Sequence, residues 1–337
     1  MINYIYQLVA PKLISVKYSY ENPENKVIIR PEYMAICHAD QRYYLGQRSP
    51  KKMNEKLPMA LIHESVGIVV QDNTGTFKTG QKVVMIPNTP VRENDIIYEN
   101  YNKGSYFLSS GYDGFMRELV YMPLDRVVPY ENIDPKIAAI TEFASVAIHG
   151  IDRFNLLAHE KRDRIGIWGD GNLAYTVASM LKELYPSSKI IVVGKHSNKL
   201  AHYSFVNETY TIDYLPEDFE IDHAFECTGG EGSHHAIDDI IKYIAPQGTV
   251  ALMGVSENKV PIYTRDILEK GLIFVGCSRS GKKDFEKAIE VMKDKKVQNR
   301  LSTIINYEGA VYSISDIHEI FLKDMTTPFK TVFKWDV

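Results

Sequence analysis

Cysteine is scarce in this chain of 337 residues. Its three cysteines, Cys37, Cys227 and Cys277, lie far apart. A sparse, odd set does not form the disulfide framework of small secreted domains, so the expected environment is reducing. The N-terminal stretch MINYIYQLVAPKLISVKYSY also lacks a basic region followed by a long apolar run. We therefore expect no signal peptide and a cytoplasmic location.

Long apolar runs and an excess of one charge are also missing. No window approaches the ~18 uninterrupted apolar residues that suggest a membrane-spanning helix. Lys and Arg total 39 against 43 Asp and Glu, giving a net charge of −4. No basic footprint for a nucleic acid results. The content of 45% hydrophobic and 24% charged residues is that of a globular protein, and the length predicts two domains.

The residues that are present follow two different patterns. The first 140 residues or so contain β-branched runs such as NKVIIRPEYMAIC and ESVGIVVQD, bounded by turn residues. After Arg164, short strands that are apolar on both faces alternate with helices. This alternation predicts a parallel sheet covered on both sides. We expect an α/β protein with one domain at 1–146 and 282–337 and another at 147–281.

A glycine-containing turn stands between the predicted strand RIGIW and a helix. In GDGNLA, Gly169 permits a tight turn, Gly171 allows close approach of a pyrophosphate, and Ala174 keeps helix and strand together. The context favours a dinucleotide site over a merely tight turn. The predicted cofactor-binding residues here are Gly169, Gly171, Asn172, Leu173 and Ala174.

The second strand of this unit, in KIIVVGKHSNKL, does not end in a carboxylate. Sites that prefer NAD usually place Asp or Glu there to hold the ribose 2′-hydroxyl. Lys195 and Ser197, with Lys199 as a further candidate, instead suit the 2′-phosphate of NADPH. The alternative is that Lys195 is an ordinary solvated charge. We predict NADPH.

Cys37 lies in AICHADQRYY, and His63 and Glu64 follow in LPMALIHESVG. Cys37 is a packed thiol, a nucleophile or a metal ligand. A cysteine, a histidine and a carboxylate from separate segments fit a catalytic zinc site, which uses three protein ligands and leaves a fourth position open. The spacing alone favours a packed core thiol just as well.

These motifs together carry a resemblance. Cys37-x-x-Asp40, His63-Glu64-x-x-Gly67, GTFKTGQKVV and GDGNLA resemble the zinc-dependent medium-chain dehydrogenase/reductase superfamily along nearly the whole chain. The resemblance implies a GroES-like catalytic domain and a Rossmann domain. It makes Cys37 and His63 zinc ligands, and the third ligand is Glu64, Glu142 or an exchange between them or with water. It also makes Asp40 the carboxylate that orients the zinc histidine, and Cys227 a buried structural thiol.

The chain also departs from this superfamily. No cysteine occurs between about Pro87 and Gly114, where a structural zinc lobe is expected, so we predict one zinc per chain. Ile62 stands where glycine commonly precedes His-Glu. Ala39 replaces the usual Ser or Thr proton relay and cannot carry a proton. The candidates to replace that relay are His38, Tyr43, Tyr44 or a zinc-bound water held by Glu64 or Glu142.

A more specific similarity is carried by MAICHADQRYYLGQR, SYFLSSGYDGFM, DHAFECTGG and CSRSGKKDF. These stretches resemble the alcohol dehydrogenases that reduce ribulose 5-phosphate to ribitol 5-phosphate for CDP-ribitol and teichoic acid or capsule synthesis. The resemblance implies that zinc polarises the C2 carbonyl, that NADPH delivers hydride, and that a cytidylyltransferase is a functional partner. It also suggests a homodimer paired through GLIFVG.

The substrate phosphate requires cations, and a guanidinium suits it best. Arg42 and Arg279 are the preferred candidates, and the others are Arg48, Lys51, Lys52 and Lys282. Two alternative functions remain: an NAD-linked polyol dehydrogenase, and a catalytically silent binding protein with the same fold.

Overall fold

The computed structural model describes residues 2–92 and 96–337. Met1, which begins the first predicted domain, and residues 93–95, inside the segment where a zinc lobe was expected, lie outside the described residues. The chain divides into two units, Met1–Ser145 with Ser280–Val337, and Val146–Arg279. These divisions fall within two residues of the predicted boundaries.

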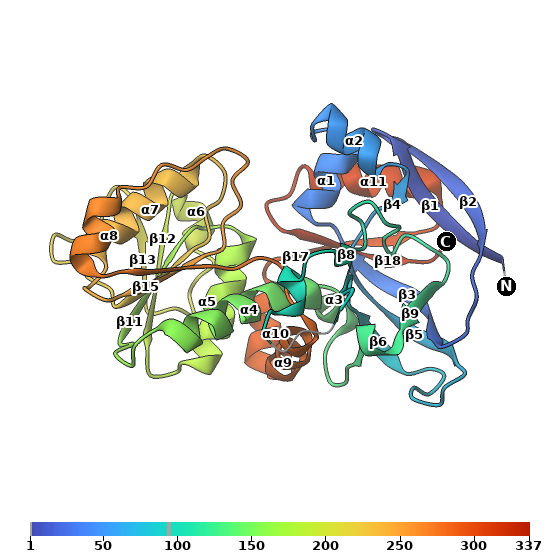
Figure 1. Ribbon diagram of the computed structural model, residues 1–337, viewed down its shortest axis with the longest axis horizontal. Coiled ribbons are helices and arrows are strands. Elements are labelled where there is room, and N and C mark those ends of the chain that lie inside the picture. Colours follow the sequence, from blue (N-terminus) through green and yellow to red (C-terminus); the bar gives the residue numbers. More distant parts are fainter. Residues whose placement is uncertain (1, 93–95) are drawn as a thin grey trace. The chain divides into compact units, whose positions relative to one another are not determined.

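The first unit is built mainly of strands (Figure 1). Its larger sheet has the order β10-β6-β5-β3-β18-β17, with β9 also paired to β3, and a smaller sheet has the order β2-β1-β4. The strands are β1 Ile2–Ala10, β2 Leu13–Tyr20, β3 Lys26–Ala35, β4 Met59–Ala60, β5 Glu64–Asp72, β6 Lys82–Met85, β7 Asn88–Thr89, β8 Tyr106–Phe107, β9 Val120–Pro123, β10 Val127–Pro129, β17 Ile305–Val311 and β18 Lys330–Trp335.

Helices of this unit join or cover the strands. They are α1 His38–Tyr44, α2 Pro50–Lys56, α3 Pro135–Ala138, α9 Lys282–Met292, α10 Lys295–Ser302 and α11 Ile314–Asp324, with 3₁₀ turns η1 Glu99–Tyr101 and η2 Leu124–Arg126. The core holds apolar side chains from both ends of the chain, including Leu8, Met34, Phe115, Phe321 and Phe333. Because residues 280–337 complete this core and its sheet, the catalytic domain is discontinuous in sequence.

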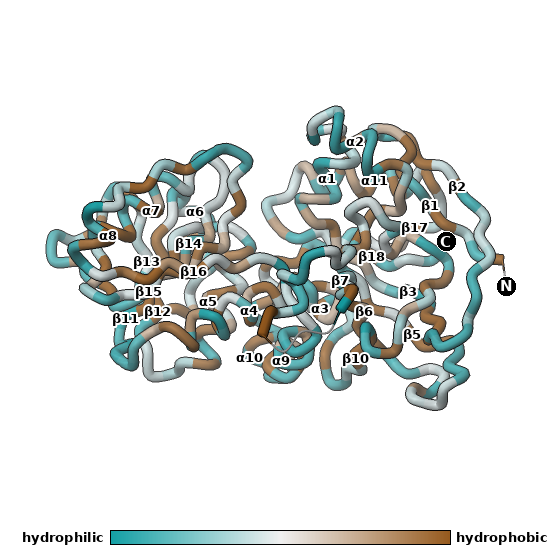
Figure 2. Tube along the Cα trace, viewed as in Figure 1, coloured by the Kyte–Doolittle hydropathy of each residue, from teal (hydrophilic) through white to brown (hydrophobic). Residues whose placement is uncertain are grey.

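The second unit is a parallel six-stranded sheet in the order β13-β12-β11-β14-β15-β16. Its elements are β11 Arg164–Trp168, α5 Asn172–Leu184, β12 Lys189–Gly194, α6 Ser197–Leu200, β13 Glu208–Thr211, β14 His223–Glu226, α7 Gly232–Tyr243, β15 Thr249–Leu252, α8 Thr264–Lys270 and β16 Ile273–Gly276. This strand order is that of a dinucleotide-binding fold. In Figure 2 the hydrophobic colour gathers on strands of this sheet, whereas many connecting loops are hydrophilic.

The connecting helix α4, Thr141–Leu157, starts in the first unit and continues in the second. Most other predicted elements form where the sequence patterns place them, but the short polar strand β13 does not follow from the apolar-run pattern. Its sequence ETYT is half-exposed or exposed along its length. Among the described residues, no helix combines the length and the hydrophobicity needed to cross a membrane.

Candidate active site

The metal site begins with the pairing of two strands. β3 and β5 run antiparallel, with Ala35 opposite Glu64. Cys37 follows the end of β3 and His63 precedes the start of β5, so the register brings the two to the same end of the strand pair. Cys37, His63 and Glu64 each offer one ligand atom, and these atoms lie within 4.8 Å of one another. The structure therefore brings together three of the predicted ligands.

Asp40 lies beneath this set and is fully buried. Its Oδ1 accepts hydrogen bonds from the Ile62 amide at 3.0 Å and from Ser109 Oγ at 2.6 Å. Its Oδ2 lies 3.4 Å from His63 Nδ1 and accepts from the Cys37 amide at 3.2 Å. Asp40 thus fixes the imidazole and leaves its other nitrogen available as a ligand atom.

The electrostatics of Asp40 and His63 favour a charged pair. Burial alone would raise the pKa of Asp40, but the charge of His63 and hydrogen bonds from His63, Ser109 and Ile62 lower it below its usual value. Burial would likewise lower the pKa of His63, yet the charges of Asp40 and Cys37 hold it well above 6.5. A site that stabilises positive charge at His63 is also suited to a metal cation.

Ile62 occupies a backbone conformation that its residue type disfavours. Its φ is +70°, in the left-handed region where glycine is the usual residue. The Ile62 amide donates to Asp40 and its carbonyl accepts from the Phe115 amide at 2.8 Å. The sequence places isoleucine where glycine is expected, and the observed φ therefore implies backbone strain beside His63.

Glu64 makes a buried ion pair with Lys330, the first residue of β18. Lys330 Nζ donates to Glu64 Oε1 and, at 3.1 Å, to the Ile36 carbonyl. The other carboxylate oxygen, Glu64 Oε2, is buried and has no hydrogen-bond partner among the described residues. An unpartnered buried carboxylate oxygen beside a cysteine and a histidine fits a bound zinc ion.

Glu142 lies near the start of α4 and is buried. It is not part of the 4.8 Å set, but its charge acts on Glu64. Burial is the main cause that raises the pKa of Glu64 to about 7, Lys330 lowers it, and Glu142 raises it. The described geometry groups Glu64, and not Glu142, with Cys37 and His63, and the choice of third ligand stays a prediction.

The predicted dinucleotide loop forms between β11 and α5. Gly169 has a φ of +132°, and a Cβ there would lie 3.0 Å from the backbone of Cys227. Gly171 precedes the N-terminus of α5, and nothing would approach a Cβ placed on it. Asn172 and Leu173 begin the helix and are partly exposed, and Ala174 is buried. The loop thus presents open backbone at a helix N-terminus, as a pyrophosphate requires.

A carboxylate nevertheless reaches the end of β12. Asp170 Oδ2 accepts hydrogen bonds from the Lys195 and His196 amides at 2.9 and 2.7 Å, and it lies 2.8 Å from His196 Nδ1. Lys199 Nζ is 3.7 Å from Asp170 Oδ1. No acidic residue directly follows β12, as the sequence indicated. The fold nevertheless brings the carboxylate of Asp170 from the glycine loop to this position, where His196 and Lys199 lie beside it.

Known protein families match both parts of the chain. The alcohol dehydrogenase GroES-like domain matches residues 23–132, and the zinc-binding dehydrogenase domain matches residues 175–294. The chain is 57% identical to the ribulose-5-phosphate reductase of Streptococcus pneumoniae over 340 residues, which cover 100% of this chain and 98% of that protein. The chain belongs to the zinc-binding alcohol dehydrogenase family.

Two further relatives of this zinc-binding alcohol dehydrogenase agree. The ribulose-5-phosphate reductase of Bacillus spizizenii is 47% identical, and the match covers 100% of both chains. The crystal structure of S. aureus TarJ in complex with NADPH has a TM-score of 0.90 and 44% identity, again over 100% of both chains. The predicted superfamily and the GroES-like plus Rossmann fold are confirmed.

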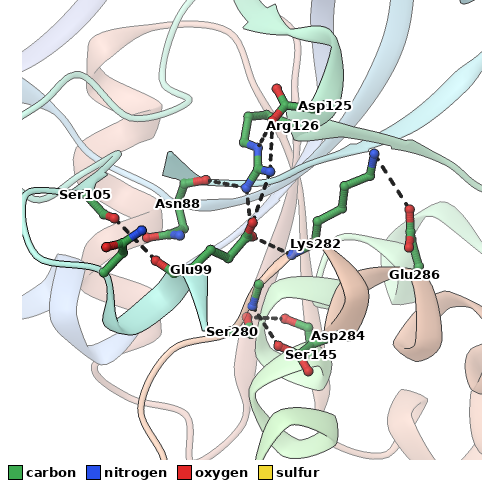
Figure 3. A network of polar contacts seen from close by, with 12 residues as sticks. Asn88, Glu99, Ser105, Asp125, Arg126, Ser145, Ser280, Lys282, Asp284 and Glu286 are labelled. Atoms are coloured by element: carbon green, nitrogen blue, oxygen red, sulfur yellow. Dashed lines mark hydrogen bonds and ion pairs between the residues drawn. The ribbon is translucent and has the colours of Figure 1, made fainter. Parts of the chain in front are cut away.

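The family's zinc-lobe segment, from about Pro87 to Gly114, is anchored in this dehydrogenase by an ion pair (Figure 3). Glu99 Oε1 and Oε2 accept from Arg126 Nη1 and Nη2 at 2.8 and 3.2 Å. Glu99 Oε1 also accepts from the Lys282 amide at 2.6 Å, at the start of α9. A Cβ on Gly281 would meet Glu99 Cγ at 2.7 Å, so the contact requires glycine there.

The remaining predicted residues are spread over both units. Arg42, on α1, donates to the Gln47 carbonyl at 3.4 Å, and Arg279 is exposed with a φ of +58° in the second unit. Arg48 lies over the Tyr43 ring. Lys51 pairs with Glu55 and Lys282 with Glu286 at the surface, and Lys52 is exposed. Their role toward a substrate phosphate stays a prediction.

The proton-relay candidates differ in their surroundings. The Tyr44 hydroxyl lies 2.8 Å from His318 Nδ1, and its buried ring stacks on Phe321 of α11. Tyr43 is also buried, whereas His38 is exposed next to Cys37. Cys227 is a buried thiol whose pKa burial raises, as its structural interpretation expects.

Sequence reasoning missed Lys330, Ser109 and Asp170. Lys330 and Ser109 lie far in sequence from the motifs to which they contribute. Asp170 lies within the glycine motif, but its position there did not indicate a role at the end of β12. Lys330 is 266 residues from Glu64. Its only signal in the sequence is a lysine that opens the final strand, KTVFKW.

Proposed function

We propose that this enzyme reduces D-ribulose 5-phosphate to D-ribitol 5-phosphate with NADPH. The observation that carries the proposal is the 57% identity, over the whole chain, with a ribulose-5-phosphate reductase, together with the intact set Cys37, His63 and Glu64. The overall change is C=O + NADPH + H⁺ to CH–OH + NADP⁺. A catalytically silent binding protein would have no need for this buried ligand set.

Zinc is held by Cys37, His63 and a carboxylate from Glu64 or Glu142, and when bound it supplies a Lewis acid for the C2 carbonyl oxygen. Asp40 orients His63 through its Nδ1, so the imidazole presents one fixed nitrogen to the metal. Because no cysteine occurs between Pro87 and Gly114 and Glu99 anchors that segment, one zinc per chain is expected.

NADPH, when bound, supplies the hydride. Gly169 and Gly171 shape the turn that receives its pyrophosphate, and the N-terminus of α5 faces that negative charge. Lys195 and Ser197 are exposed just after β12, and in this proposal they bind the 2′-phosphate. Asp170 fixes the backbone of Lys195 and His196. This arrangement favours NADPH over the alternative of an NAD-linked polyol dehydrogenase.

The reduction also consumes a proton and requires an anchor for the substrate phosphate. Ala39 cannot carry the proton, so exposed His38, or a water molecule held by Glu64 or Glu142, delivers it. Arg42 and Arg279 bind the phosphate through planar, always-charged guanidinium groups. In this proposal a free ketose loses this anchor and becomes a poor substrate.

The cellular role follows from the product. In this proposal a cytidylyltransferase consumes ribitol 5-phosphate to make CDP-ribitol for teichoic acid or capsule, and both enzymes work in the cytoplasm. β16 is one of the two edge strands of the parallel sheet, and pairing with its copy across a two-fold axis would form a homodimer.

The test is an NADPH-oxidation assay with the purified zinc enzyme. The panel contains ribulose 5-phosphate, xylulose 5-phosphate, fructose 6-phosphate and free ribulose, each also measured with NADH. We expect ribulose 5-phosphate with NADPH to give the highest kcat/KM, and a strong chelator to abolish turnover. Oxidation of a free sugar alcohol with NAD⁺ at a higher kcat/KM than any ketose phosphate reduction with NADPH would instead establish the polyol dehydrogenase.

A further inference from the structure

Lys330 is a buried cation that the reaction described above leaves without a role. Its side chain is 6% exposed, and the Glu64 side chain is 0% exposed. Lys330 Nζ contacts Glu64 Oε1 and the Ile36 carbonyl, and it lies 4.6 Å from the centroid of the Phe143 ring, within the range of a cation–π interaction. Three segments therefore enclose one ammonium group directly behind the metal ligands.

The ammonium group faces several negative groups at once. It forms an ion pair with Glu64 Oε1 and donates a hydrogen bond to the Ile36 carbonyl, and the charges of Cys37 and Glu142 also act on it. Leaving a lysine charged inside a protein is costly unless such partners surround it. The position is thus built to keep a positive charge next to the ligand set.

Glu64 divides its two oxygens between different tasks. Oε1 is bound by Lys330, while Oε2 is buried without a hydrogen-bond partner among the described residues. A carboxylate whose charge is partly neutralised by an ammonium group is a weaker metal ligand than a free one. Lys330 and a metal ion therefore compete for the charge of Glu64.

We propose that Lys330 is a positioning residue that keeps Glu64 a weak, exchangeable zinc ligand. Without Lys330, Glu64 would bind the metal permanently and fill the position that the substrate oxygen requires. The inference rests on the proposed function, since it assumes a zinc ion at Cys37 and His63. It adds a determinant of metal coordination from the end of the chain.

The test uses a double-mutant cycle on zinc affinity. The variants are Lys330→Gln, Glu64→Gln and the double variant, with Lys334→Met on the same strand as the matched control; Lys334 is half-exposed and pairs with Asp336 at 3.0 Å. Gln at position 330 retains a donor for the Ile36 carbonyl. The zinc dissociation constant is measured by competition with a chelator, and cobalt(II) absorption spectra report the coordination number.

We expect Lys330→Gln to tighten zinc binding about tenfold, the scale on which outer partners tune metal sites. The effect should be small in the Glu64→Gln background, because Lys330 acts through Glu64. The cobalt spectrum should shift toward higher coordination in Lys330→Gln, and Lys330→Arg should restore the wild-type spectrum. Lys334→Met should match wild type in both measurements.

Two results would overturn the inference. One is unchanged zinc affinity and an unchanged cobalt spectrum in Lys330→Gln. The other is equal tightening with and without Glu64, which would mean that Lys330 acts only as a nearby charge. If Lys330→Gln does not fold, the double variant replaces it, because the double variant buries neither charge without its partner. Its zinc dissociation constant is then compared with that of Glu64→Gln, and the two should be equal. Failure of wild type to bind zinc, or a cobalt spectrum without a thiolate band, would refute the proposed function itself.

Discussion

Asp40 connects three segments of the chain at the scale of single residues. It accepts hydrogen bonds from the amides of Cys37 and Ile62 and from the Ser109 hydroxyl, and it faces His63. Two of these contacts come from residues with positive φ, Ile62 at +70° and Ser109 at +61°. The local strain is therefore offset by hydrogen bonds to one buried carboxylate.

Replacing Asp40 should loosen the metal. In Asp40→Asn, one oxygen becomes a donor that cannot satisfy the groups now bound to it, and His63 loses its charged partner. We expect the zinc dissociation constant to rise about 10–100-fold, measured by chelator competition. Asp238→Asn, on α7 and partly exposed, should leave zinc binding unchanged. Wild-type affinity in Asp40→Asn would contradict the orienting role of this residue.

Lys195 should decide between the two nicotinamide cofactors. Removing it in Lys195→Ala deletes a charge-assisted contact to the 2′-phosphate, so we expect kcat/KM with NADPH to fall about tenfold or more. The value with NADH should change little, because NADH has no phosphate at that position. Lys189→Ala, at the other end of β12 beside Glu208, is the matched control. An equal loss with both cofactors would point to a structural role for Lys195.

At the scale of elements, the segment from Pro87 to Gly114 illustrates a contact over long sequence distance. The carboxylate of Glu99, in η1, accepts hydrogen bonds from the two terminal nitrogens of Arg126 and from the first amide of α9. Below it, Ser280 Oγ lies 2.7 Å from Ser145 Oγ, and the Gly281 amide donates to Asp284 at 2.7 Å (Figure 3). Polar contacts thus join this segment, α4 and α9.

Breaking this ion pair should destabilise the first unit. Arg126 is 4% exposed, so Glu99→Gln leaves a buried guanidinium with only the mostly exposed carboxylate of Asp125 as a charged partner. We expect a loss of about 2–4 kcal/mol in the free energy of unfolding, measured by urea denaturation. Glu286→Gln removes a surface pair with Lys282 and should change stability by less than about 0.5 kcal/mol. Equal effects of the two substitutions would show that Glu99 does not anchor the segment.

Some of these elements and contacts could be predicted from the sequence, and others could not. The glycine loop, β5 and α5 were predictable because each is recorded in a local pattern of apolar, glycine or charged residues. Two short motifs suggested a metal site at Cys37 and His63, whereas their assignment as ligands came from the family resemblance, which left Glu64 and Glu142 as alternatives. Lys330 and the Glu99–Arg126 pair did not, because they depend on which strands and helices meet in space. A lysine that opens a strand carries no local sign of the partner it meets.

At the scale of the whole molecule, the two units can be observed separately. The chain has two tryptophans, Trp168 in the parallel sheet and Trp335 in β18. In a Trp335→Phe background, the fluorescence of Trp168 reports unfolding of the second unit alone. That unit also contains His223, a histidine with no exposed surface, at the start of β14.

His223 should make the second unit sensitive to acid. Its Nδ1 accepts from the Thr249 amide at 3.0 Å, and the tilted ring of His159 lies 4.3 Å away between centroids. Burial, followed by the charge of His159, lowers the pKa of His223 from 6.5 to about 4. Between pH 6.5 and pH 4, His223 is therefore protonated in the unfolded chain but neutral in the folded unit. Stability is full above pH 6.5 and decreases as the pH falls toward 4, by about 3 kcal/mol in total.

The measurement is urea unfolding followed by Trp168 fluorescence at several pH values between 7 and 4. His223→Asn retains an acceptor for the Thr249 amide but does not titrate, so its stability should depend less steeply on pH across this range. Asp222 and Arg162 also act on His223, and both remain in the variant, so their contributions cancel in the comparison. If wild type and His223→Asn lose stability in parallel, the proton is taken up elsewhere, with His159 as the next group to replace.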